Sequence, residues 1–233
     1  MLFASVYDKG PVALKNQDAI LYEQVVVDGK QVVFAAICDG IGGLQEGEKA
    51  SFFVTLELRK FFYEKLIEMI HKRKGQKKIE DALHLQIKKC GKMLRRYGEA
   101  QNLQLGTTLT AVWCYQNKYT IFHIGDSRAY LVGKKLRQIT EDDVYENGSL
   151  SKCVGSTRYQ PCQIYHGRIG KRDCMLLCSD GFRKELMPEE IRDFLQRDRH
   201  MAENILQKRL QKALETCRLR GEKDNVSAMV IGW

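Results

Sequence analysis

The chain has 233 residues, of which 44% are hydrophobic and three are proline, so it can form a full core and is typical of a globular protein. Its 38 basic and 29 acidic residues give a net charge of +9 at pH 7. No apolar stretch approaches the roughly 20 residues of a membrane span, and the N-terminal residues do not resemble a signal peptide. We therefore expect a cytoplasmic protein that does not bind membranes.

The N-terminal part of the chain predicts three strands followed by two helices. Strands are expected over about 2–7, 19–27 and 31–38, and an Asp28-Gly29 turn joins the last two as a hairpin. From about 45 to 73, apolar residues recur at three- and four-residue steps, and a second such run covers about 78–100. We expect these two helices to form an antiparallel pair on a sheet.

The rest of the chain returns to strands and ends with two more helices. A helix is expected after Pro188 and another over about 201–219. Antiparallel strands in groups, with helices inserted in pairs, predict one α+β domain with a layered sandwich, spanning residues 1–233. The strands in this part are expected near 106–115, 118–124, 127–133, 136–139, 162–169, 173–179 and 225–232.

The cysteines and the basic segments each allow more than one interpretation. Several of the eight cysteines lie inside apolar strand runs and no Cys-x-x-Cys pair occurs, which favours buried reduced thiols over disulfides or zinc. Basic residues gather at 71–78, 88–96 and 218–223. Solvated helix ends explain them best, and a surface that steers anionic partners such as phosphoproteins is the second explanation. We expect no nucleic-acid binding, because there is neither a recognition motif nor interleaved aromatic residues.

Four strand-like runs meet an aspartate at a turn. Asp39, Asp126 and Asp180 follow such runs, and Asp224 precedes the last one. Each aspartate alone is ordinary turn chemistry. Together, they predict a cluster of carboxylates at one edge of a folded sheet, where Mg²⁺ or Mn²⁺ would find the oxygen ligands that it prefers.

The segment CDGIGGLQEGEKAS at 38–51 is the most specific of these signals. Three glycines within four residues after Asp39 allow a sharp turn that brings the Gly40 carbonyl close to whatever Asp39 binds. A tight turn before a helix is the structural alternative. The segment lacks the Lys-Ser/Thr ending of a P-loop and the spacing of a dinucleotide-binding loop, which argues against a nucleotide site. Upstream, KNQDAI places Asp18 at the start of a strand.

The motifs NQDA, DGIGG, GTTLTAVW, GDSRAYL, ITEDD, CSDGF and DNVS occur in that order. In this respect the chain resembles the metal-dependent protein phosphatases of the PPM (type 2C) family, bacterial serine/threonine subgroup, over about residues 5–232. The resemblance implies a four-layer α/β/β/α sandwich, two antiparallel sheets flanked by helix pairs. It also implies hydrolysis of phosphoserine and phosphothreonine with two Mn²⁺ or Mg²⁺ ions and a site for a third.

The same resemblance assigns roles to individual residues. Asp39 matches the carboxylate that bridges two metals, and the Gly40 carbonyl matches a ligand of one of them. Asp180 and Asp224 match ligands of the other ion. Two such cations can activate a water molecule for attack on phosphorus, so no protein nucleophile is needed.

Two further acidic positions and the phosphate-binding position complete this assignment. Asp18 matches a metal ligand or a group directly behind the ligands, and Asp126 matches a residue that helps to hold a third ion. The arginine that usually clamps substrate phosphate is replaced by Ala13. Lys15 is a nearby candidate, but lysine lacks the bidentate fork of arginine. We therefore expect weaker phosphate binding, or a clamp from another basic residue.

Other departures from the family pattern affect the surroundings of the metals. Gln17 and Ile41 replace an acidic residue and a histidine found in many relatives, and His123 is expected to be a packed strand residue. Between about 143 and 154 the chain is shorter than bacterial relatives that carry a helical flap. The leading hypothesis is a phosphatase that acts on phosphorylated proteins and reverses a cognate serine/threonine kinase. The alternative is a catalytically weak or inactive pseudophosphatase that binds phosphoproteins.

Overall fold

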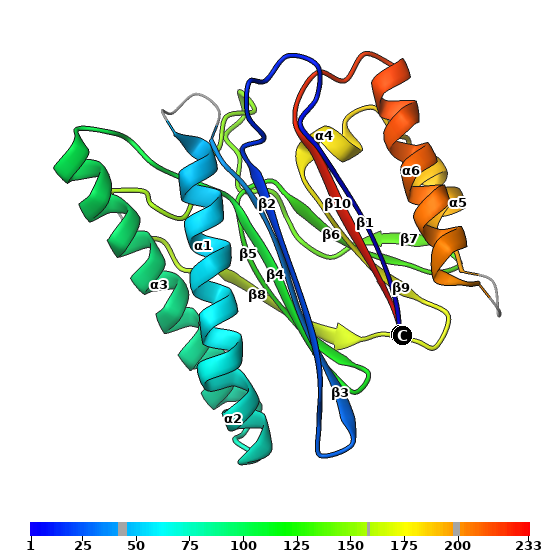
Figure 1. Ribbon diagram of the computed structural model, residues 1–233, viewed down its shortest axis with the longest axis horizontal. Coiled ribbons are helices and arrows are strands. Elements are labelled where there is room, and N and C mark those ends of the chain that lie inside the picture. Colours follow the sequence, from blue (N-terminus) through cyan, green and yellow to red (C-terminus); the bar gives the residue numbers. More distant parts are fainter. Residues whose placement is uncertain (42–45, 158, 198–200) are drawn as a thin grey trace.

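Two antiparallel sheets face each other in the computed structural model, which describes residues 1–41, 46–157, 159–197 and 201–233 (Figure 1). The first sheet has the strand order β2-β3-β4-β5-β8. Its strands are β2 (Asp18–Val27), β3 (Lys30–Asp39), β4 (Leu109–Tyr115), β5 (Lys118–Ile124) and β8 (Gln163–Arg168).

The second sheet contains both the first and the last strand of the chain. Its order is β1-β10-β9-β6-β7, and β1 pairs with β10 so that Leu2 lies opposite Gly232. Its strands are β1 (Leu2–Asp8), β6 (Arg128–Val132), β7 (Leu136–Gln138), β9 (Cys174–Cys178) and β10 (Val226–Gly232).

Helices cover the outer face of each sheet, which gives four layers. In Figure 1, α1 and α3 lie side by side against the first sheet, and α5 and α6 lie against the second. The predicted α+β sandwich is therefore confirmed. The helical segments are α1 (Gly47–Phe61), η1 (Phe62–Leu66), α2 (Ile67–His71), α3 (Gln76–Gln101), α4 (Asp180–Arg183), α5 (Pro188–Leu195) and α6 (Glu203–Leu219).

Strand β3 shows how the sequence specifies these layers. Phe34 and Ala36 pack in the core beneath α1 and α3, whereas Ala35 and Ile37 pack in the core between the two sheets. All four side chains are fully buried. A strand covered on both faces is apolar throughout rather than at alternate positions, and this explains the uninterrupted run VVFAAIC.

The structure differs from the predicted elements in two places. The helix predicted over 45–73 contains a π-helical turn, η1, between α1 and α2. Asp180 and Gly181, expected in a turn, begin the short helix α4, which has only four residues. The predicted glycine turn after Asp39 falls partly on residues 42–45, which lie outside the described residues.

The arrangement brings several strand ends to one end of the molecule. The start of β2, the end of β3, the end of β9 and the start of β10 meet at the upper end of Figure 1, where α4 also lies. The turn between α2 and α3 lies at the opposite end. The expected edge of aspartates therefore coincides with one physical end of the sandwich.

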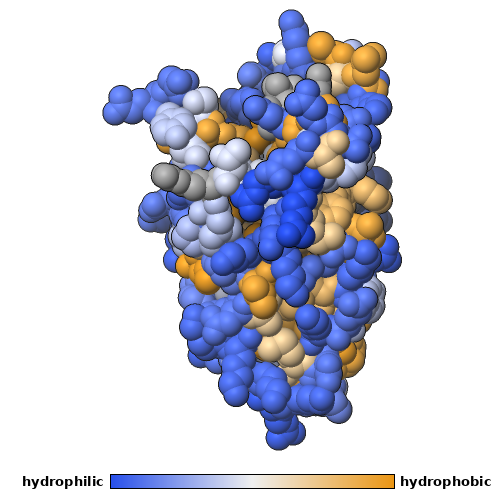
Figure 2. Space-filling view, turned by 90° about the vertical axis from the view of Figure 1, so that its left-hand side faces the viewer, coloured by the Kyte–Doolittle hydropathy of each residue, from blue (hydrophilic) through white to orange (hydrophobic). Residues whose placement is uncertain are grey.

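One face of the molecule is largely polar (Figure 2), and most of the cysteines are buried. Figure 2 shows a face that is mostly hydrophilic, with apolar side chains scattered among polar ones. All eight cysteines are free thiols, and seven of them are buried. No helix within the described ranges is long and apolar enough to cross a membrane.

Candidate metal centre

Asp18 and Asp39 form a cross-strand pair at the end of the β2–β3 hairpin. Their Cα atoms are direct partners in the antiparallel register. Asp18 is only 2% exposed, its carboxyl oxygens make no hydrogen bond of good geometry, and the nearby Ser179 and Ser227 hydroxyls offset only part of the cost of its burial. Like charges placed opposite each other are destabilising, and a buried carboxylate that is not fully hydrogen-bonded is costly. A positive charge bound beside these two carboxylates would therefore stabilise the folded protein.

Three more aspartates reach the same place from other elements. Asp126 lies in the turn between β5 and β6, Asp180 opens α4 directly after β9, and Asp224 stands just before β10. They share with Asp39 a cavity of about 210 Å³. Its lining consists of Gln17, Asp39, Gly40, Ile41, Thr108, Asp126, Leu150, Asp180, Asp224 and Asn225. The sequence thus predicted correctly that Asp39, Asp126, Asp180 and Asp224 come together.

The backbone at this cavity is held by polar side chains that sequence reasoning did not single out. The Asn225 side chain accepts a hydrogen bond from the Gln17 N–H at 2.7 Å and donates one to the Lys9 carbonyl at 2.7 Å. The Thr108 hydroxyl accepts from the Asp39 N–H at 2.9 Å. Asn225 lies in the motif DNVS and Thr108 in the motif GTTLT. The sequence therefore drew attention to both segments, but it did not predict that these two side chains hold the backbone.

Two glycines are required by close backbone contacts around the cavity. A Cβ atom on Gly40 would lie 2.3 Å from the Gly47 carbonyl oxygen and 2.7 Å from that of Gln17. A Cβ atom on Gly181 would lie 2.2 Å from the Asn225 carbonyl oxygen. Any side chain at either position would push apart the segments that carry the aspartates.

Burial and mutual repulsion raise the pKa values of the central carboxyl groups. Burial raises the pKa of Asp18 to about 7; the Ser227 and Ser179 hydroxyls oppose this shift, and the charges of Asp180 and Asp224 add to it. The pKa of Asp39 lies well above its usual value, first because of burial and then because of Asp18. Burial and the charge of Asp180 raise the pKa of Asp126 to about 6. The cluster therefore favours either protons or a bound cation.

Two basic side chains lie beside this cluster: Arg183 is the last residue of α4, and Lys184 follows it directly. The Lys184 ammonium is 2.6 Å from Asp180 Oδ2 and 3.7 Å from Asp224 Oδ2. The Arg183 guanidinium donates to the Asp126 carbonyl and to Asp142 Oδ2, both at 3.3 Å. Sequence reasoning missed both residues, because a lysine in SDGFRK looks like an ordinary exposed helix residue.

The donor set fits a hard divalent cation in kind, although it is not yet arranged as a ligand shell. Within the described ranges, no group of three or more His, Cys, Asp or Glu side chains could hold a metal ion as it stands. Asp18 does not itself line the cavity, but it offers two buried carboxyl oxygens directly across the hairpin from Asp39. Carboxylate and carbonyl oxygens are the ligands that Mg²⁺ and Mn²⁺ take. Turning the side chains of Asp180 and Asp224 away from Lys184 would add two more.

The structure places the remaining predicted residues outside this cavity. Lys15 is exposed, and its ammonium bonds Glu48 at 2.6 Å, so it makes no contact with the aspartates here. Ala13 does not line the cavity either. His123 is fully buried and bonded to Thr110 and to the Glu141 carbonyl. Its prediction as a packed strand residue is confirmed.

The segment after Thr140 forms a short wall of the cavity. Asp143, which is 6% exposed, accepts hydrogen bonds from the Gly125 N–H at 3.1 Å and from Gln163 at 2.9 Å, and it pairs with Lys152. An isolated bridge joins Val144 to Leu150, which lines the cavity. Asp143 thus fixes this loop to the first sheet.

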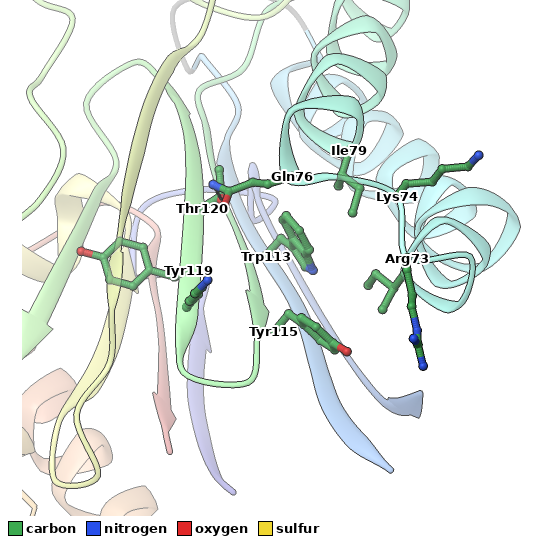
Figure 3. Close-up of a pocket in the computed structure, with 10 residues that line it drawn as sticks. Arg73, Lys74, Gln76, Ile79, Trp113, Tyr115, Tyr119 and Thr120 are labelled. Atoms are coloured by element: carbon green, nitrogen blue, oxygen red, sulfur yellow. Dashed lines mark hydrogen bonds between the residues drawn. The ribbon is translucent and has the colours of Figure 1, made fainter. Parts of the chain in front are cut away.

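Another cavity lies far from the aspartates. Figure 3 shows it between β4, β5 and the turn that connects α2 to α3, with Trp113 and Tyr115 on one side and Arg73 on the other. Its volume is about 270 Å³, and no carboxylate lines it. Tyr115 pairs with Val32, seven residues from Asp39 along β3, which corresponds to roughly 23 Å. The chemistry suggested by the aspartates cannot take place there.

Comparison with known proteins agrees with the site. The family model described as protein phosphatase 2C matches residues 12–217. The serine/threonine phosphatase stp of Listeria welshimeri is 26% identical over 247 residues, covering 96% of this chain and 92% of the relative.

Solved structures extend the likeness to the whole fold. The serine/threonine phosphatase Stp1 from Staphylococcus aureus is 25% identical with a TM-score of 0.80, covering 100% of this chain and 95% of that chain. The catalytic domain of the serine/threonine protein phosphatase PstP, solved in complex with two manganese ions, has a TM-score of 0.77 at 24% identity. That match covers 98% of this chain and 96% of that one.

Proposed function

This chain belongs to the protein phosphatase 2C family, and we propose that its aspartate cavity is the metal centre of a serine/threonine protein phosphatase. The relatives are named bacterial serine/threonine phosphatases, and one of them was solved with two manganese ions, which supports a phosphoric monoester hydrolase that uses Mn²⁺ or Mg²⁺. The single observation that carries the assignment to this cavity is the convergence of Asp39, Asp180 and Asp224 beside the buried carboxyl group of Asp18.

The acidic residues can be assigned to different metal ions according to their positions. Asp39 lies centrally and would face two ions, with the Gly40 carbonyl contributing to one. Asp180 and Asp224 would hold the other ion, and Asp126 would hold a third. Asp18, behind Asp39, would act as a ligand or as a buried negative charge that retains the ions. Bound Mn²⁺ or Mg²⁺ would lower the pKa of a coordinated water and offset charge on the phosphoryl oxygens.

The chain's own scaffold contributes rigidity to this chemistry. Asn225 and Thr108 fix the backbone at Gln17 and Asp39, and the close contacts of Gly40 and Gly181 set the separation of the ligand-bearing segments. Such fixed positions matter because catalysis of phosphoryl transfer depends mainly on positioning and electrostatics. The lining contains no serine, cysteine, lysine or histidine among the described residues, and the hydroxyl of Thr108 is bonded to the Asp39 N–H.

The substrates follow from the same class of chemistry. The protein would act on phosphoserine and phosphothreonine in phosphorylated proteins, including the substrates of a cognate kinase, within the cytoplasm. Residues 1–233 would form a single domain with a shortened flap at about 143–154. Because Ala13 replaces the usual arginine, Lys15 would contribute at most a weak contact to the substrate phosphate.

Hydrolysis of p-nitrophenyl phosphate and of a phosphothreonine peptide tests this proposal. We expect turnover with Mn²⁺, none with EDTA, and a loss of at least about 100-fold in Asp39→Asn and Asp180→Asn, because electrostatic stabilisation is lost. Asp81→Asn, on an exposed part of α3, is the control with the same chemical change. Metal-independent turnover, or full activity in both cavity variants, would refute the proposal. Binding of the phosphopeptide without hydrolysis would instead indicate a pseudophosphatase.

A further inference from the structure

Lys184 occupies a position that the proposed function leaves unexplained. It lies four residues after Asp180, and its backbone N–H donates to the Asp180 carbonyl at 3.0 Å, so the turn of α4 holds the two residues together. Its ammonium lies between Asp180 and Asp224, at 2.6 and 3.7 Å. These are the two carboxylates assigned to the same metal ion.

The surrounding charges explain why an ammonium group is stable there. Asp18, Asp39, Asp126, Asp180 and Asp224 gather within one small region, and their charges interact with one another. The Arg183 side chain is directed to the Asp126 carbonyl and Asp142 and leaves the Asp180–Asp224 pair to Lys184. The Lys184 side chain is 45% exposed. It can therefore move into water without leaving an unpaired buried charge.

We infer that Lys184 is a built-in counter-ion of the metal centre, and that its ammonium competes with the divalent cation for Asp180 and Asp224. The inference rests on the proposed metal-binding role of these two aspartates. In the metal-free protein, Lys184 offsets part of the repulsion in the cluster and so stabilises the fold. A divalent ion must displace the ammonium before it gains both carboxylates, and this displacement lowers the affinity for the metal.

Lys184→Met tests the inference by metal binding alone, without substrate. Isothermal titration of metal-free protein with MnCl₂ should give a dissociation constant about two- to fivefold below that of the wild type, the size expected for a partly exposed charge pair. The metal-free variant should also unfold at a lower temperature, because the carboxylates lose their counter-charge. Its rise in melting temperature on adding Mn²⁺ should be larger than that of the wild type.

Two further variants make the result specific. Lys184→Arg retains the charge and should bind Mn²⁺ as weakly as the wild type. Lys77→Met removes a lysine from an i,i+4 pair with Asp81 on α3, with a distance of 2.8 Å, and should leave Mn²⁺ binding unchanged. Unchanged or weaker Mn²⁺ binding in Lys184→Met would overturn the inference, because Lys184 would then support the ligands rather than compete for them. Absence of Mn²⁺ binding by the wild type would instead refute the proposed metal centre itself.

Discussion

Asp18 and Asp39 show how a single pair of residues can oppose folding and serve a site. Each lies at the end of a strand next to apolar residues, and each stands opposite a like charge. The strand pairing places them there regardless of charge, because the register follows from the buried positions of the hairpin. The raised pKa values of both residues reflect the free-energy cost of burying two negative charges together, and a bound cation would offset that cost.

The pKa of Asp18 leads to a prediction about pH. Its value of about 7 in the folded protein exceeds the ordinary value of about 3.9 in an unfolded chain. The folded state therefore holds this proton more tightly, and the metal-free protein should lose stability as the pH rises from about 4 to 7. The raised pKa values of Asp39 and Asp126 contribute to the same decline, so Asp18→Asn should remove part of it and raise the stability at pH 8 by on the order of 2 kcal/mol.

The measurement is thermal unfolding in EDTA between about pH 5 and 8. This window avoids groups such as Glu190, whose pKa is lowered to about 2 by Arg220 and which adds stability only as the pH rises through lower values. Asp81→Asn is again the control, because the residue is exposed on α3. A wild-type melting temperature that stays level or climbs across the window would contradict the prediction.

A second prediction at this scale concerns the missing arginine. Ala13→Arg should lower KM for a phosphothreonine peptide by several-fold, because a guanidinium can hold a phosphate in a bidentate way. The comparison is steady-state kinetics of the variant and the wild type at saturating Mn²⁺. Leu14→Arg, at a neighbouring position that is 95% exposed, is a matched control. If KM does not fall, the substrate phosphate is held elsewhere.

The aspartates could be predicted from the sequence, but their neighbours could not. Asp39, Asp126, Asp180 and Asp224 each stand at a recognisable end of a strand, so a local pattern reveals them. The contacts of Asn225 with Gln17 and Lys9 span more than 200 residues, and the link from Lys184 to Asp224 depends on where α4 meets β10. Contacts between distant segments have no signature in a single sequence.

At the level of elements, α4 connects the second sheet to the metal centre. It is too short for helical periodicity to reveal it, and its first residue is itself one of the aspartates. The π-helical turn η1 was missed for a related reason: one wider turn hardly changes the spacing of apolar residues in a long helix. Long, strongly periodic elements such as α3 and the buried strands were predicted within a few residues.

Gly181 leads to a prediction about this connection. In Gly181→Ala, the new Cβ would lie 2.2 Å from the Asn225 carbonyl oxygen, so α4 or the start of β10 must shift. We expect a loss of about 1–3 kcal/mol in stability, as for other overpacked sites, together with at least about tenfold weaker Mn²⁺ binding. Chemical denaturation and isothermal titration would measure the two effects. Gly75→Ala, where a Cβ meets nothing within 4 Å, should change neither, and equal behaviour of the two variants would argue against the packing role.

At the scale of the whole molecule, part of the excess positive charge lies away from the aspartate cavity. The net charge is +9, and part of the basic excess, at residues 71–78, lies at the turn between α2 and α3, opposite the aspartate cavity. Figure 2 shows that polar side chains dominate the face it presents. A positive field of this kind attracts anionic partners over distances of the order of the Debye length, about 8–10 Å at physiological salt.

This field predicts a salt dependence that differs between substrates. Between about 50 and 300 mM NaCl, kcat/KM for an acidic phosphoprotein such as phosphorylated casein should fall several-fold, because screening weakens its attraction to the basic surface. The value for p-nitrophenyl phosphate, a small substrate that meets only the cavity, should change less. Parallel assays at fixed Mn²⁺ make the comparison. Equal salt effects on both substrates would show that the basic surface does not guide the phosphoprotein.

The pairing of β1 with β10 has a consequence for folding during synthesis on the ribosome. β1 is made first, yet its neighbour in the sheet is the last strand to emerge, and Asp224 immediately precedes that strand. Until β10 is made, β1 lacks the strand that joins it to β9, and both of its edges are open to wrong partners. A nascent chain that stalls before Asp224 would therefore contain every strand of the first sheet but lack one carboxylate of the proposed metal centre.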